Sequence, residues 1–193
     1  TDVTKVYHLI EKMASLGIPL LVHGEVTDTN IDIFDREKVF IETILYPLIE
    51  RYPELRVILE HITTEDAVEF VKSTTRNIAA TITVHHLLYN RNALLEGGLN
   101  PLYFCLPVLK RDTHQRALID AATSGDRKFF LGTDSAPHPI EDKSRGLSSK
   151  PGIFSAPCSL ELYTTIFDEE NSIEQLEKFS KNGKINVPFR VIF

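Results

Sequence analysis

"IPLLVHGE" (residues 18–25) is an apolar run that ends on a histidine and an acid. A run that is apolar at successive positions is typical of a strand buried on both faces of a parallel sheet. An amphipathic helical pattern over residues 6–17 precedes this run and closes at Gly17, and a second helical pattern follows over residues 35–52. The stretch therefore predicts one strand of an α/β fold, with a helix before it and a helix after it.

The same alternation continues along the rest of the chain. The next three predicted strands cover residues 55–64, 77–87 and 128–134, and the helical patterns between and after them cover 65–73, 113–125, 157–169 and 172–183. Strands separated by single helices imply right-handed crossovers and a parallel sheet. Such units fit either a small doubly wound domain or part of an eight-stranded barrel.

Composition limits the classes of protein to consider. With 193 residues, 42% hydrophobic and 25% charged, the chain is long enough for one domain with a sizeable core. A net charge of -6 and the lack of a basic stripe argue against a nucleic-acid partner. No apolar run reaches the roughly 18 residues that span a membrane, and no signal pattern appears. Cys105 and Cys158 fit free thiols of a cytoplasmic protein.

Three of the predicted strands end on a residue that could bind a metal or move a proton. These residues are His23, His61 and Asp134, and the two histidines are separated by about one strand–helix–strand repeat. Catalytic groups of parallel barrels gather at the carboxyl ends of the strands. Histidine is a common zinc ligand, and an aspartate can accept a proton from metal-bound water. The pattern alone leaves open both metal-assisted hydrolysis and ordinary structural roles.

Longer motifs around these residues carry a resemblance to a known family. They are "PLLVHGEV", "EHITT", "NRN", "CLP", "LGTDSAPH" and "GIFSAP". Together they resemble the dihydroorotases of the single-enzyme bacterial, plant and fungal type, which belong to the amidohydrolase superfamily. The resemblance implies the C-terminal part, about strands five to eight, of a (β/α)8 TIM-type barrel over residues 1–183. Strands one to four would then precede Thr1.

The resemblance also implies a role for five residues. His23 and His61 would be ligands of zinc, with two zinc ions per complete site, and Asp134 would be both a ligand and the catalytic base. His138 would bind the substrate carboxylate, and Leu106 would offer backbone groups to the substrate ring. The implied reaction interconverts N-carbamoyl-L-aspartate and dihydroorotate in pyrimidine biosynthesis. The only implied partners are this small-molecule substrate and, since dimers are common in the family, a second copy of the chain.

The sequence departs from the family pattern in two places. A His-x-His pair on strand one and a carboxylated lysine on strand four complete the family's metal site, and neither is located here. We therefore expect the 193-residue chain by itself to bind zinc weakly and to have little activity. Residues 184–193 match the family poorly, so they are set apart as a divergent tail of unknown role.

Two alternatives remain beside this hypothesis. One is another cyclic-amide hydrolase of the superfamily, such as a hydantoinase or an allantoinase. The other is a non-catalytic barrel relative that serves as a scaffold or partner subunit. We expect no catalytic role for the remaining polar residues near the motifs. His85 and His86 would support the structure, Cys105 would be a small buried apolar residue, and Lys110 would lie in a solvated loop.

Overall fold

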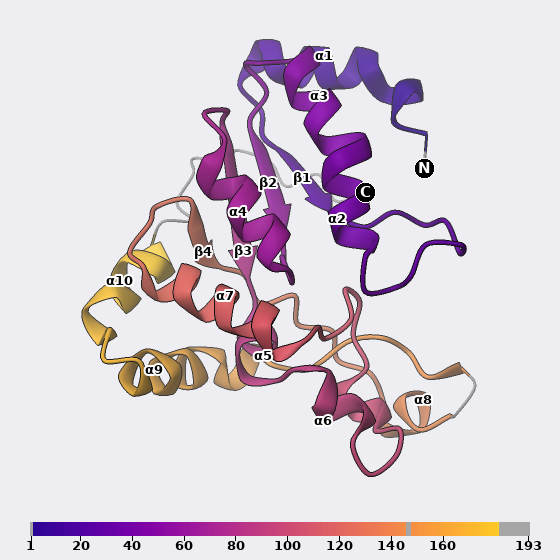
Figure 1. Ribbon diagram of the computed structural model, residues 1–193, viewed down its shortest axis with the longest axis vertical. Helices are drawn as coiled ribbons and strands as arrows, with labels where there is room; N and C mark the ends of the chain where they lie inside the picture. The colour runs from indigo at the N-terminus through magenta and orange to yellow at the C-terminus, as the bar shows by residue number, and fades with distance from the viewer. Residues whose placement is uncertain (1, 146–147, 182–193) are drawn as a thin grey trace.

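A parallel sheet of four strands forms the centre of the computed structural model, which describes residues 2–145 and 148–181 (Figure 1). The strands are β1 (Leu20–His23), β2 (Val57–Glu60), β3 (Ile78–Ile82) and β4 (Phe129–Leu131). Their order in the sheet is their order in the chain. A doubly wound sheet reverses its strand order at a switch point. The unreversed order is that of consecutive units of a (β/α) barrel.

Helices connect the strands and cover the sheet. Those before β3 are η1 (Val3–Val6), α1 (Tyr7–Leu16), α2 (Arg36–Phe40), the π-helical η2 (Ile41–Leu45), α3 (Tyr46–Arg51) and α4 (Glu65–Ser73). Those after β3 are α5 (Val84–Leu88), α6 (Arg91–Leu95), η3 (Pro101–Tyr103), α7 (Asp112–Thr123), α8 (Ile140–Lys143), η5 (Ala156–Cys158), α9 (Ser159–Glu169) and α10 (Ile173–Lys181). None of the described helices is long and apolar enough to cross a membrane.

The register of the sheet sets the heights of the strand ends. His23, the last residue of β1, is paired with Glu60, the last residue of β2, so His61 follows one position beyond the pair. β2 lies between two neighbours and is almost wholly buried, as its apolar sequence predicts. Between β3 and β4, Ile82 is paired with Leu131. The two histidines thus leave adjacent strands at nearly the same level.

All four strands end earlier than predicted, and the third and fourth bear on candidate site residues. The third was predicted to reach residue 87, but it stops at Ile82 because Thr83 caps α5, its side chain accepting from the backbone N–H of His86. His85 and His86 therefore lie on a short helix. The fourth was predicted to reach Asp134, but β4 ends three residues before it. The N–H of Gly132 still donates to the Ile82 carbonyl (3.4 Å), so the chain stays beside β3 after the strand ends.

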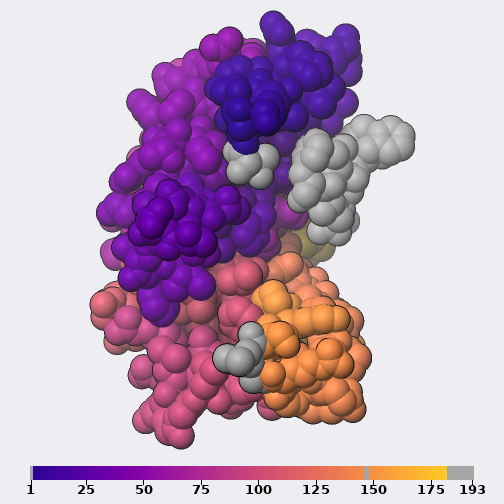
Figure 2. Space-filling model, turned by 90° about the vertical axis from the view of Figure 1, so that its right-hand side faces the viewer, coloured from indigo at the N-terminus to yellow at the C-terminus, as the bar shows by residue number. Residues whose placement is uncertain are grey.

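The segments after the carboxyl ends of the strands form one end of the molecule. In Figure 1 the arrows of β1 and β2 point toward the end where α5, α6 and α8 lie. Figure 2 shows the same division, with the indigo and purple N-terminal residues above and the pink to orange residues below. The predicted tail, residues 184–193, lies outside the described residues.

Candidate active site

The ends of β1 and β2 bring His23 and His61 together. Nδ1 of His23 lies 3.3 Å from Nε2 of His61, and the ring centroids are 4.9 Å apart. That separation is close to the distance between two nitrogens that share one tetrahedral metal ion, given metal–nitrogen bonds of about 2.0–2.1 Å. His61 is buried, whereas the side chain of His23 is 44% exposed. The pair has one buried face and one face that a ligand can reach.

His61 is held in an unusual backbone conformation. Its φ is 43°, in the left-handed region that is uncommon for residues other than glycine. The β3 residue Thr81 stabilises this turn, because its hydroxyl accepts from the His61 N–H (2.7 Å) and its carbonyl accepts from the Ile62 N–H (3.0 Å). Non-glycine residues in this region cost about 1–3 kcal/mol and cluster at functional sites. The turn thus directs the imidazole toward His23 instead of continuing the strand.

The charge state of His61 suits a metal ligand. Burial, with a smaller contribution from His23, lowers the pKa of His61 to about 3. The ring is therefore neutral near pH 7, and a neutral imidazole carries the lone pair that a metal needs. Its Nδ1 is buried and makes no hydrogen bond within the described residues. The pair of rings therefore fits a cation held between His23 Nδ1 and His61 Nε2.

A buried carboxylate fixes the loop that follows His61. Glu37 on α2 accepts hydrogen bonds from the backbone N–H and the hydroxyl of both Thr63 and Thr64. Thr64 in turn caps α4 by accepting from the Ala67 N–H. Glu37 thereby joins α2 to the N-terminus of α4 and to the loop that follows His61.

Asp134 follows β4 by three residues and shares the backbone conformation of His61. Its φ is 39°, and its side chain is exposed. Gly132 allows the approach to β3, because a Cβ at this position would lie 2.6 Å from Cβ of Thr81. Asp134 lies near the buried Cys105: burial raises the pKa of that thiol to about 12, and the Asp134 charge contributes to the rise. Thr81 therefore adjoins both the turn at His61 and the segment that leads to Asp134.

His138 and Leu106 belong to two loops that are tied together. Nε2 of His138 lies 3.0 Å from the Pro151 carbonyl oxygen, so the ring is engaged with its own loop in this structure. Leu106 precedes a cis proline and is half-buried. The buried Lys143 links the two loops, since Nζ donates to the carbonyls of Phe104 (2.8 Å) and Gly152 (2.7 Å). Burial lowers the pKa of this lysine.

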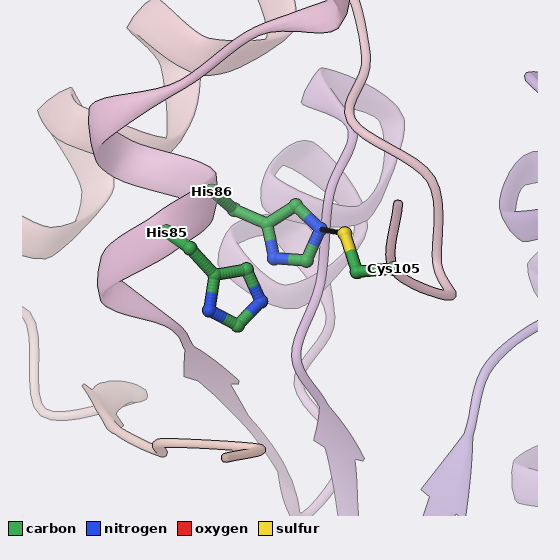
Figure 3. A group of neighbouring side chains, drawn as sticks. All are labelled: His85, His86 and Cys105. Carbon is green, nitrogen blue, oxygen red and sulfur yellow. Dashed lines mark hydrogen bonds between the residues drawn. The ribbon is translucent and has the colours of Figure 1, made fainter. Parts of the chain in front are cut away.

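His85, His86 and Cys105 form a second cluster near the site (Figure 3). One ligand atom from each lies within 4.8 Å of the others, and all three residues are buried. His86 is already engaged through both ring nitrogens, with the Thr83 hydroxyl (2.6 Å) and the Pro107 carbonyl (3.0 Å). The Cys105 thiol donates to the same carbonyl (3.3 Å). His86 and Cys105 thus act first as supports of the Leu106 turn, the structural role predicted for His86.

Sequence reasoning missed the two charged residues that flank the His23 side of the pair. Oε2 of Glu25 lies 3.2 Å from Nε2 of His23, and Oε1 of Glu25 lies 3.9 Å from Nζ of Lys110. Lys110, predicted as part of a solvated loop, is in fact 4% exposed. Burial lowers its pKa, while Glu37 and Glu25 oppose that effect. Glu25 reaches His23 through a tight turn, because its N–H donates to the His23 carbonyl (3.1 Å). Its place two residues after a strand-end histidine was a usable signal.

Comparisons with known proteins identify what the chain is similar to. The model of the amidohydrolase family matches residues 3–183. A dihydroorotase of Hahella chejuensis is 57% identical over 180 residues, which are 93% of this chain and 52% of that protein. The chain thus spans about half the length of the curated relatives it matches.

Solved structures agree on the fold. A dihydroorotase of Saccharomyces cerevisiae in complex with 5-fluoroorotic acid superposes with a TM-score of 0.86 at 32% identity, covering 96% of this chain and 54% of that one. An L-hydantoinase of Arthrobacter aurescens superposes with a TM-score of 0.79 at 18% identity, covering 95% and 46%. The second likeness bears on the fold alone. The predicted fold, a part of a TIM-type amidohydrolase barrel, is confirmed.

Proposed function

The chain belongs to the amidohydrolase family, and we propose that it carries the strand-end residues of a dihydroorotase. The substrate class is a six-membered cyclic amide with a carboxylate, and the reaction interconverts dihydroorotate and N-carbamoyl-L-aspartate. The observation that carries the proposal is the 3.3 Å approach of His23 Nδ1 to His61 Nε2. The identity of 57% with a dihydroorotase over 180 residues supports this choice of substrate.

Each residue of the proposed site has a role that its position supports. His23 and His61 hold a metal ion, which we propose to be zinc because histidine nitrogens are common zinc ligands. Such a metal, when bound, polarises the ring carbonyl and makes a nucleophile available near neutral pH. Asp134 moves a proton between the nucleophile and the amide nitrogen of the ring. His138 and the backbone at Leu106 bind the substrate carboxylate and ring.

The same proposal implies a pathway, a cellular compartment and partners for the enzyme. The pathway is pyrimidine biosynthesis, the compartment is the cytoplasm, and the substrate is the main partner. Free thiols support this compartment: Cys105 and Cys158 are unpaired in the structure. A second copy of the chain is the one protein partner we propose.

A chimeric enzyme tests the proposal. In this chimera, the 180 residues of the Hahella chejuensis dihydroorotase that match this chain are replaced by their counterparts from it. The chimera should close N-carbamoyl-L-aspartate at a rate within about tenfold of the intact relative. The 193-residue chain alone should show little turnover, because a catalytic zinc normally needs three protein ligands.

The same assay separates the alternatives. A folded chimera that opens hydantoin but not dihydroorotate would assign the chain to another cyclic-amide hydrolase. A folded chimera that acts on neither substrate would favour a non-catalytic relative. Either result would overturn the proposal.

A further inference from the structure

We propose that Glu25 is a positioning residue for the metal ligand His23, and that Lys110 anchors it. This inference rests on the proposed function, because it concerns the same metal site. Oε2 of Glu25 lies 3.2 Å from His23 Nε2, on the side of the ring opposite the His61 contact. The three residues form a row from the buried Lys110 to the metal-facing nitrogen of His23.

The contact with Glu25 fixes which nitrogen of His23 faces the metal. An ionised carboxylate only accepts hydrogen bonds, so the His23 proton lies on Nε2. Nδ1 then presents its lone pair toward His61 Nε2, 3.3 Å away. A histidine ligand that donates its other N–H to a carboxylate is held in one tautomer and one orientation, and it is a stronger base. Glu25 therefore presets His23 for metal binding.

An ion pair with Lys110 holds the Glu25 carboxylate in place. The side chains of Glu25 and Lys110 are 6% and 2% exposed, and the 3.9 Å between Oε1 and Nζ is an ion-pair distance. Nζ also donates to the Val108 carbonyl (3.0 Å), and the Lys110 carbonyl accepts from the Arg91 N–H (2.8 Å). Lys110 is thus fixed independently of Glu25. The row also joins the end of β1 to the loop that carries Leu106.

Oε1 of Glu25 has no hydrogen-bond partner among the described residues, although it is buried. Buried polar atoms are nearly always hydrogen-bonded, so this exception calls for an explanation. Oε2 of Glu25 is hydrogen-bonded to His23 while Oε1 makes the longer ion pair with Lys110, as a positioning role requires.

Cobalt binding by the chimera tests this inference. Metal-free chimera is titrated with Co²⁺ against a competing chelator, and the visible spectrum of the bound ion is recorded. Glu25→Gln keeps the shape of the side chain but removes its charge, and should weaken Co²⁺ binding by about 10- to 100-fold with an altered spectrum. Glu25→Asp keeps the charge and should recover part of the affinity. Glu42→Gln, at an exposed position, is the matched control and should bind as the parent does.

Lys110→Met gives a second test. It should weaken Co²⁺ binding by less than Glu25→Gln does, and the double variant should bind no more weakly than Glu25→Gln alone, because both act through His23. Parental affinity and spectrum in Glu25→Gln would overturn the positioning role. A parent chimera that binds no metal and has no activity would instead overturn the proposed function, and this inference with it.

Discussion

Buried histidines at the carboxyl end of the sheet make stability depend on pH. Burial lowers the pKa of His61 to about 3 and that of His85 to about 4, from an ordinary value of 6.5. Between about pH 4 and pH 6.5, the unfolded chain therefore binds more protons than the folded chain. The free energy of unfolding should fall as the pH falls from about 6.5 toward 4, and should be fully retained above 6.5.

We expect His85→Gln to reduce this pH dependence. Each buried histidine contributes a slope of up to about 1.4 kcal/mol per pH unit within its window. Urea unfolding of the metal-free chain between about pH 7 and pH 5 measures the slope. His8→Gln, at an exposed position of α1, is the control. Equal slopes for the parent and His85→Gln would show that His85 is not buried as a neutral ring.

Asp134 carries the proton transfer in the proposed mechanism. Asp134→Asn keeps the size of the side chain but cannot accept a proton, so kcat of the chimera should fall by about 10²- to 10⁴-fold. Steady-state kinetics with dihydroorotate measures this fall. Asp168→Asn, on the exposed face of α9, should leave kcat unchanged. Activity of Asp134→Asn near that of the parent would remove Asp134 from the catalytic role.

At the scale of elements, Glu37 joins α2 to the loop between β2 and α4. Glu37→Gln replaces one accepting oxygen with a donating amide, so donors on Thr63 or Thr64 lose their partner. The free energy of unfolding should fall by about 1–3 kcal/mol. Chemical denaturation measures it, with the exposed Glu42→Gln as the control on the same helical segment. Identical unfolding midpoints for the two variants would contradict the bridging role of Glu37.

Strand positions could be predicted from the sequence, and strand ends could not. The apolar runs at β1 and β2 are long and bounded by helical patterns, so both strands lie where they were expected. The third run was extended too far because Val84 and Leu87 are apolar, whereas the cap at Thr83 starts a helix. A single capping side chain thus outweighs the apolar pattern at a boundary.

At the scale of the whole molecule, the sheet has two open edges. Within the described residues, β1 is paired only with β2, and β4 only with β3. Unpaired edges are templates for pairing with other chains. The 193-residue chain should therefore associate with increasing concentration, as measured by light scattering. The chimera should associate less, and a constant mass of 21.9 kDa for the chain alone would contradict this expectation.

The positions of the two proposed metal ligands were predictable from the sequence, and those of their supporting residues were not. His23 and His61 stand at strand ends in the sequence, and parallel pairing alone places them side by side. Lys110 and Lys143 act through contacts between distant segments, which periodicity does not reveal. The left-handed backbone at His61 is likewise stabilised by a tertiary contact, the hydrogen bond from its N–H to the Thr81 hydroxyl. Sequence therefore specifies the chemistry of the site, and packing specifies its geometry.

The metal content of the chimera tests the central claim most directly, namely that His23 and His61 hold the metal of an amidohydrolase site. Elemental analysis after buffer exchange should give about two zinc ions per parent chimera, as the resemblance implies. His61→Asn should lose at least one of them while the protein stays folded, as checked by circular dichroism. An unchanged zinc content in folded His61→Asn would contradict the account.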